Sequence, residues 1–187
     1  MAYVLFISED KLKDSTAING NVDVEFLLPY VRVAQKIYVE TKLGTDLYKK
    51  LEAEITAGTL AGAYKTLVDE YIGDMLCQYA FYECIPFLRF KIQNGNIYSK
   101  TSENGTAISD SEASLLREEV RNTAEYYTER LVDYLCNNNT AFPEYSTNSG
   151  SDVRPDTDSF YSSMNLERPT GQGTKLTLRN FLTSGLS

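Results

Sequence analysis

The chain has 187 residues, of which 42% are hydrophobic and 24% are charged. This length predicts one domain with an extension, and the composition excludes a wholly disordered chain. Acidic residues outnumber basic ones by 26 to 18, for a formal net charge of −8, whereas a free-standing domain that grips DNA or RNA is usually basic. Because the sequence contains no histidine, Ser-His-Asp and Cys-His nucleophile systems and His-ligated metal sites are excluded.

Tyrosine is abundant, with 14 copies, and tryptophan is absent. Tyrosine is enriched at protein interfaces, although it also fills cores where tryptophan is missing. The cysteines Cys77, Cys84 and Cys136 form an odd, sparse set that predicts reduced thiols used in packing. No apolar run is long enough to span a bilayer and the first residues lack the basic region of a signal peptide, so we expect no membrane association.

Residues 1–22 form a short N-terminal segment, and the helical core is expected over 23–136. The first helical spacing of apolar residues spans 24–40. Within it, the regular helix is expected to start near Leu28, because Pro29 fits best in a first turn. Its apolar stripe is wide enough to indicate burial on two sides. Gly44 is typical of a helix end. The stripe consists of Phe26, Leu27, Tyr30, Val31, Val33, Ala34, Ile37 and Tyr38.

A second helix follows from Thr45 or Asp46, with Leu47, Leu51 and Ile55 on its inner face. A third helical signal spans 64–92 and is apolar around much of its circumference, so it predicts a central, buried helix. Pro86 should kink or end it.

A protruding β-hairpin is predicted at about 94–109, because Asn104-Gly105 is a strong hairpin signal. Ser109 and Glu112 form a capping box that opens a fourth helix over about 110–136. We expect Glu118, Glu125 and Glu129 on the outer side of this helix, where simple solvation is the alternative reading. Its expected inner face is Leu116, Val120, Thr123, Tyr127, Leu131 and Tyr134.

Residues 137–187 are predicted to form an extended arm, because 137–173 are polar and contain several prolines. The end of the arm alternates apolar with polar or basic residues, as a strand that docks on a partner would. The candidate docking residues are Lys175, Leu176, Leu178, Arg179, Phe181 and Leu182. The fold class is therefore predicted as mainly α: a four-helix-type bundle with a protruding hairpin and an extended C-terminal arm.

Motifs for catalysis are missing. The run from Gly171 to Lys175 does not meet the spacing of a phosphate-binding loop. The loop aspartates Asp152, Asp156 and Asp158 lack the glycine and glutamate of a calcium-binding hand. We therefore predict no catalytic, cofactor-binding or metal-binding residues, no cofactor, and no enzymatic activity.

The string from Ile37 through Leu43-Gly44-Thr45-Asp46-Leu47-Tyr48 to Leu51 lies in an acidic helical core without histidine. With the long aromatic helix and the late amphipathic helix that follow, it resembles the head–tail connector (adaptor, or head-completion) proteins of tailed bacteriophages. Over about 20–136, the chain is most similar to the neck ring proteins of crAss-like phages.

This resemblance implies a homo-oligomeric ring, usually of twelve copies, that sits in the virion neck after assembly in the host cytoplasm. Its partners would be other copies of itself, the portal protein, other neck or tail proteins, and double-stranded DNA that passes through the lumen without specific binding. The predicted subunit interface is Phe26, Tyr30, Ile37 and Tyr48, and Glu118, Glu125 and Glu129 are the candidate channel-lining residues. The alternatives are a tail terminator or stopper, and a non-phage helical adaptor for protein interactions.

Overall fold

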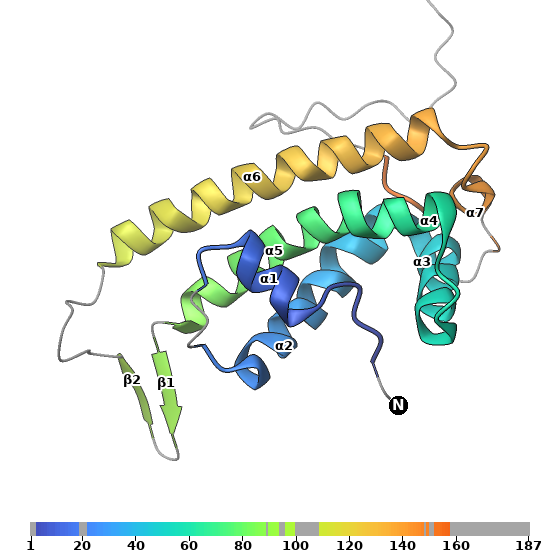
Figure 1. Cartoon of the computed structure of the whole chain (residues 1–187). Helices are drawn as coiled ribbons and strands as arrows, with labels where there is room; N and C mark the ends of the chain where they lie inside the picture. The colour runs from blue at the N-terminus through green and yellow to red at the C-terminus, as the bar shows by residue number, and fades with distance from the viewer. Residues whose placement is uncertain are drawn as a thin grey trace, which may run out of the picture.

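A central helix, α5 (Gly73–Leu88), lies between α2 (Val24–Ala34) and α6 (Asp110–Asn137), as the computed structural model in Figure 1 shows. The structure describes residues 3–18, 22–88, 90–93, 96–99, 109–147, 149 and 152–157. The protein is mainly α-helical, so the predicted fold class is confirmed at this level. The third helical signal accordingly belongs to the buried middle layer, and α5 ends two residues after Pro86.

The N-terminal segment packs onto the helical layers. A short helix, α1 (Glu9–Ser15), begins where the Ser8 hydroxyl accepts a hydrogen bond from the backbone N–H of Lys11. Leu12 and Phe6 lie in the hydrophobic core, and α1 contacts α5. Residues 3–18 are thus part of the same folded body as the helices that follow.

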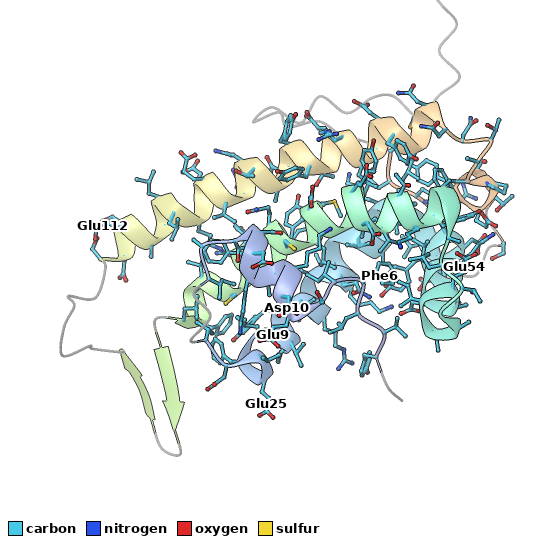
Figure 2. The ribbon with its side chains drawn as sticks, viewed as in Figure 1. Phe6, Glu9, Asp10, Glu25, Glu54 and Glu112 are labelled. Atoms are coloured by element: carbon cyan, nitrogen blue, oxygen red, sulfur yellow. The ribbon has the colours of Figure 1, made fainter. Side chains whose placement is uncertain are left out.

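The first long helix starts earlier than expected, at Val24 and not near Leu28. Pro29 is its sixth residue, where the missing N–H would have bonded to the carbonyl of Glu25. Both residues are exposed, so water can satisfy that carbonyl. Figure 2 shows Glu25 pointing away from the body of the protein.

A π-helical stretch, η1 (Gln35–Val39), joins α2 to α3 (Glu40–Ala57). Within α3, Gly44 takes a backbone conformation with φ 75° and ψ 161°, which breaks the helix. The predicted stop at Gly44 is confirmed. The break leaves the Thr45 N–H and the Thr41 carbonyl without helical partners, so both are open to other parts of the chain.

The segment that leads into α5 consists of α4 (Gly62–Thr66) and a second π-helical stretch, η2 (Leu67–Ile72). After α5, two short antiparallel strands, β1 (Phe90–Gln93) and β2 (Asn96–Ser99), pair with Phe90 opposite Ser99. The hairpin predicted over 94–109 is not supported: the two strands flank Asn94-Gly95, whereas the turn was expected at Asn104-Gly105. Asn104 and Gly105 lie outside the described part of the chain.

The long helix α6 confirms the capping box: the Ser109 hydroxyl accepts from the N–H of Glu112, whose carboxylate accepts from the N–H of Ser109. Its inner face differs from the prediction, since Leu116 and Thr123 are exposed. Of the predicted inner face, Val120 and Leu131 are buried; smaller residues such as Ala124 complete the face that α6 presents to the core, so side-chain size alone did not mark it. The buried residues are Ala113, Val120, Ala124, Thr128, Leu131, Val132 and Leu135.

The chain after α6 returns to the core. Phe142 is fully buried, and the short helix α7 (Pro143–Ser146) packs on α3, with Tyr145 also buried. The first residues predicted for the arm, from Asn137 to Ser146, therefore belong to the folded body, because the buried Phe142 and Tyr145 anchor the chain after the end of α6.

Candidate interaction site

Residues 152–157, here called the strap, lie along the helix break at Gly44. The Thr45 N–H donates to the carbonyl of Val153 at 3.0 Å, and the Val153 N–H donates to the Thr45 hydroxyl at 2.9 Å. The Asp156 N–H donates to the carbonyl of Thr41 at 3.0 Å. The backbone groups that the break releases are thus satisfied by an extended segment more than 100 residues later in the chain.

Side chains reinforce the strap. Lys42 pairs with Asp156, with 2.7 Å between Nζ and Oδ2. Just before the strap, the N–H and hydroxyl of Ser149 both donate to the carboxylate of Asp46. This role of Asp156 was not predicted from the sequence, in which Asp152 and Asp156 were interpreted as residues of a polar loop. The apolar Val153 and Pro155 inside a polar run were the available signal.

Helix α7 is anchored by a second polar cluster. Glu144 accepts hydrogen bonds from Lys50 and from the Tyr64 hydroxyl, each at 2.7 Å. Burial acts to raise the pKa of Glu144, but these two bonds outweigh it and hold the pKa below its usual value. Phe142 packs edge-on against the Tyr64 ring, with ring centroids 5.2 Å apart. Helix α7 is therefore fixed next to α3. Residues 158–187, here called the tail, lie outside the described part of the chain.

Four side chains of α2 and η1 recur at helical spacing on one side, where the end of α5 meets them. The Tyr30 ring lies between Phe26 at 5.6 Å and Phe87 of α5 at 5.1 Å. Val33 is 41% exposed, Ile37 52% and Phe87 43%. We call these five residues, Phe26, Tyr30, Val33, Ile37 and Phe87, the α2 strip.

Three of the four predicted interface residues, Phe26, Tyr30 and Ile37, share the α2 strip, but Tyr48 does not. Tyr48 is only 1% exposed, and its hydroxyl accepts a hydrogen bond from the Gln35 side chain. The assignment of Tyr48 to a surface interface was wrong, because its ring fills the core beside Phe6. Phe6 is buried, and Figure 2 shows it on the N-terminal segment, next to the helices.

The three predicted channel-lining glutamates differ in their surroundings. Glu118 is exposed, whereas Glu125 and Glu129 are half-buried. Glu125 lies 3.4 Å from Nε of Arg121. Burial raises the pKa of Glu125, Arg121 opposes this, and the charge of Glu129 adds to it. The acidic face of α6 is therefore not uniformly solvated.

The outer side of α6 also carries apolar residues that the sequence analysis did not single out. Leu115 is 62% exposed and Tyr126 is 57% exposed. Tyr126, with Asn122, Glu125 and Glu129, lines a shallow open hollow. Figure 2 shows Glu112 at the far end of this helix, well away from α3 and α7.

Each predicted docking residue from Lys175 to Leu182 lies outside the described residues. Within the part that the structure describes, no group of three or more His, Cys, Asp or Glu side chains could hold a metal ion. No helix among the same residues is long and apolar enough to cross a membrane.

A family model described as a family of unknown function, DUF6712, matches residues 39–155. The chain belongs to this family. The DUF6712 match begins at the end of η1 and stops at Pro155, so it includes the helix break at Gly44, the central helix α5, α6, and the strap as far as the residue that touches Gly44. No curated protein and no solved structure matches the chain.

Proposed function

We propose that this DUF6712 protein is a structural component of a tailed-phage virion, a ring-forming connector in the neck that joins the portal to the tail. The observation that carries this proposal is the presence of two unlike surfaces that expose apolar side chains, the α2 strip and the more polar Leu115–Tyr126 side of α6, with α5 between them. A closed ring of identical subunits needs two unlike contact faces on each copy. The resemblance to neck ring proteins of crAss-like phages supports the same function and a ring of twelve copies.

The tail supplies the contact to the portal in this proposal. The strap fixes the chain at Asp156 beside Thr41, and residues 158–187 follow from that point. The tail alternates apolar and basic residues at Lys175, Leu176, Leu178 and Arg179, and ends its apolar run at Phe181 and Leu182. Such a segment can add a strand to a sheet edge on the partner, with alternate side chains entering pockets.

The acidic charge of the chain suits a channel for DNA. A formal net charge of −8 disfavours tight binding of phosphates, so DNA can slide through without specific contacts. Of the three predicted channel-lining glutamates, the exposed Glu118 keeps the lumen assignment in this proposal, whereas Glu125 and Glu129 line the hollow on the outer side of α6. In this proposal the ring assembles in the host cytoplasm and stays in the virion neck.

Deleting residues 170–187 tests the docking tail. We expect the truncated chain to lose binding to the portal protein of the same phage, while its Tm stays within about 2 °C of the full chain, because the deleted residues lie beyond the strap. A pull-down with purified portal and a thermal melt measure the two effects. Retained portal binding by the truncated chain would contradict the docking function.

A matched pair of substitutions tests the alternation within the tail. Leu176→Asp with Leu178→Asp should abolish portal binding, whereas Thr177→Asp, on the opposite side of an extended strand, should weaken it much less. Binding to a tail-tube protein and not to the portal would favour the tail terminator or stopper. Binding to neither would favour a non-phage adaptor.

A further inference from the structure

We propose that copies of this chain associate head to tail, with the α2 strip of one copy packed on the outer side of α6 of the next. This inference rests on the proposed function in one respect: it names the subunit contact that the ring would use. It can be tested on the purified chain, without a portal or a virion.

The α2 strip is an aligned row. Phe26, Tyr30, Val33 and Ile37 follow the spacing of one helix face, offset from the buried residues of α2. Phe87 extends this row sideways through its stacking on Tyr30. Since Val33, Ile37 and Phe87 are each more than 40% exposed, the row offers a continuous apolar contact.

The outer side of α6 offers a second aligned row. Leu115 and Tyr126 are eleven residues apart, which places them within about 20° of each other around the helix. Glu119 and Asn122 fall between them on the same side, and the hollow beside Tyr126 can accept a side chain from a neighbour. This face is longer and more polar than the α2 strip.

Charge favours pairing of the two unlike faces over pairing of like faces. Helix α6 carries seven acidic residues and three arginines, so two α6 helices would repel each other. The α2 and η1 segments carry Glu25 against Arg32 and Lys36; both of these basic residues are exposed, and Lys36 also pairs with Glu40 of its own chain at 2.8 Å. Opposite charges around an apolar contact select the partner and its register. The α6 face of a second copy is therefore the occupant that suits the α2 strip.

The order of the helices, with α5 between α2 and α6, allows the same contact to form again with each further copy. Because α5 separates α2 from α6 within one copy, a contact from α2 to α6 leaves one unused face at each end of a pair. Further copies add until the assembly closes. A contact between two α2 strips would instead be satisfied by a dimer and could not build a ring.

Two single substitutions, each blocking one face, test the proposal. Ile37→Asp places a charge in the α2 strip and Tyr126→Asp places one in the α6 row; both positions are more than half exposed, so the fold should tolerate them. At about 1 mM, where even a contact with a millimolar Kd is substantially populated, we expect the unmodified chain to form species larger than a dimer. Each variant alone should remain monomeric.

The decisive sample is an equimolar mixture of the two variants. The intact α2 strip of the Tyr126→Asp copy can bind the intact α6 row of the Ile37→Asp copy, and no further copy can add. Sedimentation velocity should therefore show a one-to-one dimer that does not grow with concentration. Lys49→Asp, at an exposed position on α3 away from both faces, should assemble like the unmodified chain.

Three results would overturn the proposal: a mixture that stays monomeric, a Tyr126→Asp variant that dimerises by itself, or an unmodified chain that is monomeric at about 1 mM. Far-ultraviolet circular dichroism and Tm confirm that each variant is folded. Portal binding through the tail is measured separately, so a failed face pairing with retained portal binding rejects this contact alone. The opposite pattern rejects the neck function and keeps the contact.

Discussion

Pro155 lies directly against Gly44, so that a Cβ atom added at Gly44 would stand 2.6 Å from Cδ of Pro155. Gly44 lies near the start of the family match and Pro155 at its end, so their contact brings the two ends of the matched region together. Gly44 combines φ 75° with ψ 161°, a region that is essentially restricted to glycine. The helix break and the strap thus depend on the same residue.

Gly44→Ala should lower the free energy of unfolding by about 3 kcal/mol and Tm by roughly 10 °C. The alanine would meet both the backbone strain at this φ and the clash with Pro155. Thermal melts of the full chain measure the effect. Gly58→Ala is the matched control, since Gly58 has φ 66° with nothing within 4 Å of the added Cβ, and should cost about 1 kcal/mol. Equal losses at the two sites would contradict a close contact with Pro155.

Gln35→Leu should destabilise the protein by about 3 kcal/mol, because two buried groups and one half-buried carbonyl lose their partner. The Gln35 side chain accepts from the N–H of Phe6 and donates to the carbonyl of Val4 and to the Tyr48 hydroxyl. Tyr48→Phe removes only the last of these bonds and should cost about 1 kcal/mol. Urea unfolding of both variants distinguishes the effects, and a nearly neutral Gln35→Leu would rule out this network.

Glu144→Gln should reduce stability at pH 7 by about 1 kcal/mol and have little effect at pH 3. Because the folded-state pKa of Glu144 lies below its unfolded value, the carboxylate stabilises the fold above about pH 4, and this contribution is lost as the pH falls through the folded pKa. Urea titrations at both pH values measure the difference. Glu54→Gln is the control, since Glu54 lies 4.0 Å from the same lysine and should change stability less. A pH-independent loss at Glu144 would contradict the ion pair with Lys50.

Glu125→Gln should raise Tm at pH 7, and the gain should shrink at acidic pH. Burial raises the folded pKa of Glu125, so its ionised form opposes folding at neutral pH, while protonation removes that penalty as the pH falls through the raised pKa. Glu118→Gln, at an exposed position of the same helix, should leave Tm unchanged. Identical behaviour of the two variants would mean that Glu125 is solvated, as a lumen residue would be.

Several elements were readable from neighbouring residues. The capping box at Ser109 and Glu112 and the break at Gly44 were predicted where they occur, because each depends on hydrogen bonds and backbone angles within about one turn. The apolar spacing of Phe26, Tyr30 and Ile37 also identified three residues of the α2 strip.

Burial of individual side chains required the folded arrangement. Tyr48 and Tyr30 belong to similar apolar patterns, yet Tyr48 fills the core and Tyr30 borders the surface, because the N-terminal segment covers only the former. Leu116 was expected on the inner face of α6 and is exposed, whereas Ala124 of the same helix is fully buried. The spacing of apolar residues indicates that a helix has an apolar side. Which side is buried depends on the neighbouring helix.

Local sequence therefore established the main helices, the break at Gly44, the start of α6, the acidic character of the chain and its apolar stripes. The placement of the strap on Gly44 came from contacts between residues more than 100 positions apart. Such contacts leave no periodic trace in the sequence, since a single extended segment with Val153 and Pro155 satisfies the open backbone groups of α3. Long-range hydrogen bonding and close packing decided where residues 152–157 lie on the helical body.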